Sequence, residues 1–169
     1  SWYYGMDANT PGGKMDLVTI VLHEIGHGLG FTDSYDVKGQ DGTVGLSSSA
    51  GPTPFIFDLF VEDASGDNLL HDFASPSKPL AAALESTNLF FGGQMSATSL
   101  KGVKPELFAP ATFDNGSSIS HLDEGTFNAA ADANRLMTPQ IVINTPTPKR
   151  KRTLPGRYVA SSTPSGVWP

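Results

Sequence analysis

The sequence contains no cysteine, so neither a disulfide framework nor a metal site built on thiolates can form. It also lacks any run of about 18 apolar residues, the length that a membrane-spanning helix needs, so we expect no membrane span. Acidic residues are absent after Asp132, and residues 1–144 hold all 17 of them with 6 basic residues, a net charge of −11. Such an acidic body argues against nucleic-acid binding. The oligomeric state stays open.

The 169 residues are enough for one domain with a hydrophobic core, and a hydrophobic content of 38% is typical of globular chains. The pattern of apolar, turn-forming and charged residues predicts a mixed α+β domain. The expected elements are a strand over 1–5 whose earlier part is missing, a helix over 17–29, an irregular loop over 33–53, an amphipathic helix from Pro54 that ends before Gly66, a short helix over 80–85, a strand over 88–91 and an extended stretch over 101–115.

The motif H-E-x-x-H is the most informative feature of the chain. It follows residues 17–22, which are apolar apart from one threonine and predict a buried helix, with Asp16 suited to the N-cap. On a helix His23 and His27 stand one turn apart on the same face, so both imidazoles can bind one Zn²⁺. Glu24 lies about 100° round the helix from His23 and can act as general base toward a zinc-bound water.

A simpler interpretation of this motif is a buried helix whose two histidines are hydrogen-bonded core residues. Burying two histidines and a glutamate without partners costs free energy, which favours the metal site. Gly28 and Gly30 follow the motif and provide the end of the helix and a sharp turn after it.

Catalytic zinc takes three protein ligands and leaves a fourth position for water, so one more ligand is needed. Asp33 stands six residues after His27 and completes H-E-x-x-H-x-x-G-x-x-D, where Gly30 lets the chain turn back toward the metal. His121 stands 94 residues after His27, so the intervening chain would have to fold round. Imidazole and carboxylate are both zinc ligands, which leaves the two candidates open. His71 has no motif around it and is expected to be structural or exposed.

The H-E-x-x-H motif and the sequence Leu-Met-Thr-Pro around Met137 resemble the metzincin zinc metallopeptidases, whose methionine turn lies beneath the zinc. The chain is similar to their leishmanolysin-like branch, in which an insertion separates the zinc helix from a late third histidine. His121 precedes Met137 by 16 residues, so the resemblance implies Zn²⁺ bound by His23, His27 and His121 over a hydrophobic floor made by Met137. Asp33 replaces the histidine of the extended metzincin motif and stays the alternative third ligand.

This resemblance implies a metzincin-like zinc peptidase fold of the α+β class. Residues 1–144 would be a partial catalytic domain, truncated at its N-terminal strands and closed by an irregular C-terminal lobe. The implied activity is that of a zinc-dependent endopeptidase, which hydrolyses a peptide or protein substrate through a zinc-activated water with Glu24 as general base. Stretches such as WYYG and SISHLDE are similar to bacterial secreted proteins of this kind, so we expect a secreted, extracellular protein.

Other interpretations of the same residues remain. The chain could be a non-catalytic zinc-stabilised binding or adhesion module, or an inactive fragment of such a protease. A thermolysin-like enzyme would take an acidic ligand from a later helix, but the candidates Glu62 and Glu85 lack the E-x-x-x-D context. Asp123 and Glu124, which follow His121 closely, could orient that ligand or simply form a solvated turn or cap.

Residues 145–169 differ from the rest of the chain. They contain five of the 13 prolines and five basic residues, but no acidic residue and no helical periodicity. We expect a disordered or aberrant tail, where the resembling proteins close with an acidic, Leu-rich helix. Residues 149–152 could instead form a nuclear-targeting or polyanion-binding patch, and a reading-frame shift near Asn144 would also explain the change of composition.

Overall fold

A computed structural model describes residues 1–7, 9–94, 102–127 and 135–140. The predicted tail, residues 145–169, and the domain boundary at residue 144 lie outside these ranges. The elements in chain order are β1 (Trp2–Tyr3), β2 (Met15–Asp16), α1 (Leu17–Gly28), β3 (Tyr35–Lys38), β4 (Asp41–Val44), η1 (Phe57–Phe60), β5 (Val61–Asp63), α2 (Lys78–Leu84), β6 (Leu89–Phe91), β7 (Glu106–Leu107), α4 (Glu124–Phe127) and η2 (Arg135–Met137).

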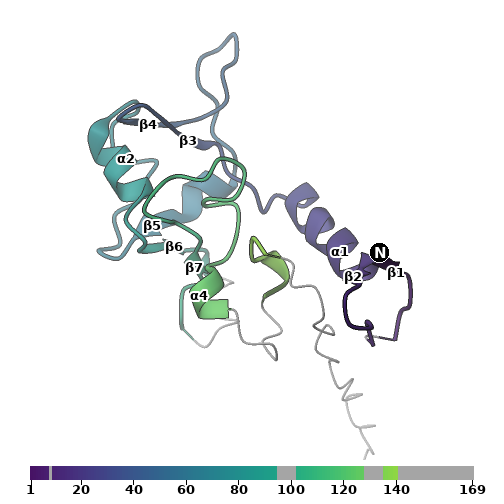
Figure 1. The fold of residues 1–169 in the computed structure, drawn as a ribbon. Coiled ribbons are helices and arrows are strands. Elements are labelled where there is room, and N and C mark those ends of the chain that lie inside the picture. Colours follow the sequence, from purple (N-terminus) through teal and green to yellow (C-terminus); the bar gives the residue numbers. More distant parts are fainter. Residues whose placement is uncertain (8, 95–101, 128–134, 141–169) are drawn as a thin grey trace, which may run out of the picture.

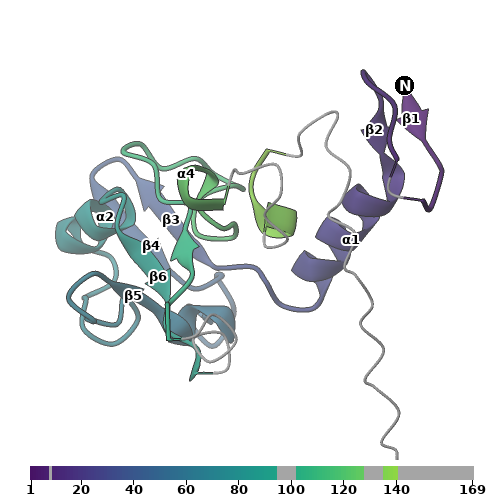
Figure 2. The same cartoon turned by 90° about the horizontal axis from the view of Figure 1, so that it is seen from below.

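The described chain mixes helices with small sheets, which is compatible with the predicted α+β class. β1 pairs in parallel with β2, β3 and β4 form an antiparallel hairpin, and β5, β6 and β7 form an antiparallel sheet in that order. Figures 1 and 2 show α1 with β1 and β2 at one side of the molecule and the other strands with α2 and α4 in a larger lobe, while η2 lies between these two parts.

The hydrophobic core fills the larger lobe. Its fully buried side chains come from the three-stranded sheet, from the connection between β5 and α2, from α2 itself and from the segment before α4: Val61, Leu69, Leu80, Leu84, Leu89, Leu107 and Ile119. The helix predicted at 80–85 is confirmed as α2, and the strands predicted at 88–91 and 1–5 are confirmed as β6 and β1. No helix in the described ranges is long and apolar enough to cross a membrane.

Helix α1 begins and ends where the sequence predicts. Asp16 is the N-cap, since its Oδ1 accepts a 3.0 Å hydrogen bond from an N–H of the first turn. Gly30 adopts a positive φ of 105°, which lets its N–H donate to the His27 carbonyl at 2.9 Å and the Phe31 N–H donate to the Gly26 carbonyl at 3.1 Å. This pair of bonds is a Schellman motif, and it turns the chain sharply away from the helix axis.

The expectation that α1 is a buried helix is wrong. Only His23 within it is buried, while Val21, Leu22, Ile25 and the adjoining Leu29 are between 43% and 84% exposed. Their spacing puts them on one face, which points away from the face that carries the histidines. An apolar run with helical spacing predicts such a face, but it does not identify the element that covers it.

The prediction of an irregular loop over 33–53 is also wrong in part, because this range contains the hairpin of β3 and β4. Gly39 turns the chain between the two strands with a φ of 67°. β4 lies against α2 so closely that a Cβ added to Gly42 would be 2.4 Å from the backbone nitrogen of Ala81. The glycines that suggested a loop therefore serve a tight turn and a close strand–helix contact.

The amphipathic helix predicted from Pro54 is replaced by the short turn η1, after which the chain enters β5. On such a helix Asp58 would lie opposite the apolar residues, on the solvent side, but it is fully buried. Its carboxylate accepts hydrogen bonds from the N–H (3.1 Å) and hydroxyl (2.5 Å) of Ser34 and from the N–H of Phe55 (2.7 Å). These three donors replace water and let a charged residue hold η1 to the start of β3.

Candidate metal centre

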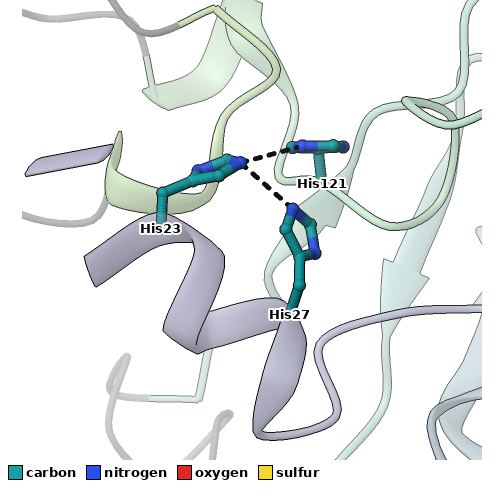
Figure 3. A group of neighbouring side chains, drawn as sticks. All are labelled: His23, His27 and His121. Atoms are coloured by element: carbon teal, nitrogen blue, oxygen red, sulfur yellow. Dashed lines mark hydrogen bonds between the residues drawn. The ribbon is translucent and has the colours of Figure 1, made fainter. Parts of the chain in front are cut away.

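Three histidine rings converge where α1 faces the larger lobe (Figure 3). His23 and His27 come from one face of α1, one turn apart, and His121 comes from the segment between β7 and α4. The Nε2 atom of His23 lies 3.0 Å from that of His27 and 3.3 Å from that of His121. The three ligand atoms lie within 4.8 Å of one another, and among the described residues they form a group that could hold a metal ion.

The second nitrogen of each ring fixes its tautomer. Each Nδ1 lies next to a backbone carbonyl oxygen: His23 with Leu136 (2.7 Å), His27 with Phe31 (2.7 Å) and His121 with Ser117 (2.8 Å). A carbonyl oxygen only accepts, so Nδ1 must carry the proton, and in a neutral imidazole Nε2 is then a bare lone pair. Three lone pairs that face one another repel unless a positive charge lies between them, so this arrangement suits a cation.

Main-chain hydrogen bonds of the larger lobe hold His121 in place. Its carbonyl accepts from the Phe108 N–H at 2.9 Å, and the Phe108 carbonyl accepts from the Ile119 N–H at 2.8 Å. The next residue, Leu122, donates its N–H to the Met137 carbonyl at 2.8 Å. Ile119 is fully buried at a φ of 66°, a conformation that costs a β-branched residue about 1–3 kcal/mol. The segment therefore depends on its surroundings for its shape, as functional segments often do.

The surroundings of His121 favour its neutral form. Burial is the main cause that lowers the pKa of His121, with smaller contributions in the same direction from the charges of His27 and His23. The hydrogen bond to Ser117 and the negative charge of Glu24 act in the opposite direction. A metal ligand must present an unprotonated nitrogen, so a lowered pKa keeps His121 ready to bind at neutral pH.

Glu24 is exposed on α1 and is not one of the converging ligand groups. Its negative charge has the smallest of the effects on the pKa of His121, in the raising direction. Within the helix it directly follows His23, so it is an acid–base group next to one of the three histidines in the chain.

The Leu-Met-Thr-Pro turn lies against α1. The carbonyl of Leu136 holds His23, as described above, and Met137 is buried with 9% of its surface exposed. The Met137 sulfur lies 2.5 Å from the position that a Cβ on Gly26 would occupy. The turn is thus packed against the helix backbone beside both helical histidines.

Asp33, the alternative third ligand, is not part of the three-histidine group. Its carboxylate accepts a 2.8 Å hydrogen bond from the Tyr35 N–H at the start of β3. The pKa of Asp33 is raised to about 7. Burial is the main cause, the hydrogen bond from Tyr35 acts in the opposite direction, and the nearby charge of Asp58 adds a smaller rise. Asp33 therefore belongs to the polar cluster at the root of the hairpin.

We expect Asp33→Asn to remove a pH dependence of stability. In the folded chain Asp33 keeps its proton up to about pH 7, whereas an unfolded aspartate loses it near pH 4. The folded state thus binds more protons between these values, and the free energy of unfolding falls as the pH rises from about 4 to 7. Denaturant titrations of metal-free protein at pH 5 and pH 8 measure this change. Between the two pH values, the free energy of unfolding should fall more in the native chain than in Asp33→Asn, by a few kcal/mol at most. Parallel losses in the two proteins would contradict the raised pKa.

The other acidic and histidine candidates lie outside the three-histidine group. His71 is exposed, as predicted, and Asp123 caps α4 by accepting the Thr126 N–H at 2.6 Å. Glu124 accepts the Gln140 N–H at 3.1 Å. Glu85 accepts the Phe113 N–H at 2.9 Å and Glu62 pairs with Lys104, so neither joins the three histidines.

Sequence reasoning missed the groups that orient the rings. They are mainly backbone carbonyls, which carry no sequence signal, together with the Ser120 hydroxyl, 3.2 Å from Nδ1 of His121. Gly26 was also missed, because it occupies a variable position of H-E-x-x-H. A glycine inside a helix lowers helix propensity, so its presence at this position could have predicted that another segment packs closely against the helix there.

Comparisons with protein-family models, with curated proteins and with solved structures gave no match. Fold and site together therefore define a mixed α and β protein in which three histidines could hold a metal ion.

Proposed function

We propose that the chain is a zinc-dependent endopeptidase. The observation that carries the proposal is the convergence of the Nε2 atoms of three histidines, two of which belong to an H-E-x-x-H helix. Glu24 is the glutamate of that motif. This combination gives a metal three nitrogen ligands, leaves a coordination position for water and supplies an acid–base group.

The spacing of the nitrogens supports zinc as the metal. Zinc–nitrogen bonds of 2.0–2.1 Å at tetrahedral angles separate two nitrogen ligands by about 3.3–3.4 Å. His23 Nε2 is 3.3 Å from that of His121 and 3.0 Å from that of His27, so both distances are close to this separation. The donor set of three imidazoles without thiolate is that of catalytic zinc sites.

In the proposed mechanism, His23, His27 and His121 would hold the metal. Bound zinc would supply a lowered pKa for a water, toward about 7, and polarisation of a peptide carbonyl. Glu24 would accept the proton of the attacking water on its carboxylate and deliver it to the nitrogen of the leaving amine. The carbonyls at Nδ1 keep the three rings in the tautomer that binds metal.

The metzincin resemblance supports the same proposal and extends it. In that family, Met137 would be the methionine turn, and the substrate would be a peptide or protein in extended form. We further propose secretion on this resemblance. The described chain would then be part of a catalytic domain.

A zinc-stabilised, non-catalytic module is the second candidate. It is favoured by the position of the histidines, because a metal there would join α1 to the larger lobe, and α1 is otherwise exposed over much of its surface. A metal that only joins two parts of a fold needs no general base, so the two candidates differ in the role of Glu24.

Casein digestion by the full chain tests the endopeptidase. We expect cleavage by protein loaded with one zinc per chain, loss of cleavage after chelation and recovery when zinc is returned, because the metal supplies both water activation and carbonyl polarisation. Stable binding of one zinc without any cleavage would exclude the endopeptidase and favour the non-catalytic module. Cleavage that survives complete removal of metal would contradict both.

A further inference from the structure

Gly26 allows the Leu136–Met137 turn to approach α1 more closely than any other residue would. A Cβ at Gly26 would lie 2.5 Å from the Met137 sulfur, 3.0 Å from its terminal carbon and 3.8 Å from its Cγ. Real Cβ atoms show essentially no contacts under 3.0 Å. The side chain of Met137 therefore runs across the helix backbone through space that a methyl group would fill.

This close approach is connected to the metal centre through one peptide unit. The Leu136 carbonyl, which accepts the Nδ1 proton of His23 at 2.7 Å, belongs to the peptide that leads into Met137. His23 is also the ring that both other histidines meet, at 3.0 and 3.3 Å. A turn that withdraws from α1 would take this carbonyl away from His23.

We propose that Gly26 is a positioning residue of the metal centre: the missing Cβ lets the turn come close enough for Leu136 to orient His23. The inference rests on the proposed metal site. It concerns a residue of the motif that neither binds metal nor transfers a proton.

The geometry of the contact decides whether Met137 alone could give way. The nearest atom is the sulfur, not the terminal methyl, so rotation about the last side-chain bond leaves the clash in place. The clash is relieved only if the turn withdraws from α1 or if the Met137 side chain rotates about a bond nearer the backbone. Such a rotation would carry the side chain into an apolar cavity of about 400 Å³, which Gly26 and Met137 line together with Phe57 and Phe91. Met137 is buried, with 9% of its surface exposed, so a rotation nearer the backbone has to displace neighbouring side chains. We therefore expect the turn to move.

The test compares Gly26→Ala with Gly28→Ala. Both add one methyl group to the same helix, but a Cβ at Gly28 meets nothing within 4 Å. We expect Gly26→Ala to weaken zinc binding about 10- to 100-fold, as expected for loss of a group that orients a ligand, and Gly28→Ala to change it less than about twofold. Competition with a chelator measures the affinity, and proton–nitrogen NMR of the metal-free protein measures whether His23 Nδ1 still carries a hydrogen-bonded proton.

A thermodynamic cycle with Met137→Ala makes the result specific. Once the sulfur is gone, adding Gly26→Ala should change zinc affinity less than about twofold. Gly26→Ala that folds with native affinity and an intact His23 signal would overturn the inference. If Gly26→Ala does not fold, recovery of folded, zinc-binding protein in the double variant supports the contact, and failure to recover overturns it. Zinc binding without peptidase activity in the native chain would contradict the proposed endopeptidase and leave this test valid.

Discussion

Replacing Glu24 by glutamine is expected to lower the rate of peptide hydrolysis by about 10²–10⁴-fold while one zinc stays bound. Glutamine keeps the shape of the side chain but cannot take a proton from the attacking water. The zinc should stay because Glu24 is exposed on α1 and is not among the three converging ligand groups. Metal analysis and casein digestion of the same preparation measure both quantities.

Glu124→Gln is the matched control for that variant. It removes the same charge three residues after His121, where the carboxylate accepts the Gln140 N–H in a 3.1 Å hydrogen bond. We expect turnover close to that of the native chain. Near-normal turnover in Glu24→Gln would end the general-base assignment, and loss of zinc in that variant would make Glu24 a ligand.

Replacing His121 by alanine is expected to weaken zinc binding by several kcal/mol, out of the roughly 10–16 kcal/mol of a full site. His121 presents its Nε2 to His23 at 3.3 Å and is buried, so its loss leaves a cavity and one ligand fewer. Asp33→Ala should change the affinity little, because Asp33 is hydrogen-bonded to Tyr35 outside the three-histidine group. Zinc titrations of both variants against a competing chelator make the comparison.

His71→Ala controls for the general loss of an imidazole, since His71 is exposed and has no place in the group. Its zinc affinity should equal that of the native chain. A strong loss in Asp33→Ala with little change in His121→Ala would reassign the third ligand to Asp33.

The sequence predicts those parts of the site that depend on local geometry. The spacing of His23 and His27 puts both on one helix face, and Asp16 and Gly30 define the two ends of that helix, as the structure has them. The approach of His121 could not be derived from spacing, because it depends on main-chain bonds to Phe108 and on a neighbouring segment that carries Met137. The resemblance, not the local pattern, predicted that His121 would be near.

Contacts between distant segments account for the errors. Asp58 is charged and has the spacing of a surface residue, but donors 24 residues earlier in the chain satisfy it inside the lobe. From the sequence alone Gly42 indicates a loop, but in the structure it lies in β4, where α2 packs closely against it. The apolar side of α1, which includes Val21 and Ile25, predicts burial from its composition alone, yet it is exposed. Local patterns give the helix and its faces, and tertiary packing decides what lies against them.

Zinc-edge X-ray absorption of the native chain loaded with one zinc tests the metal centre most directly. We expect three imidazole nitrogens and one further light atom at about 2.0–2.1 Å, and the loss of one imidazole in His121→Ala. A native spectrum with two imidazoles and a carboxylate, unchanged in His121→Ala, would contradict the three-histidine site.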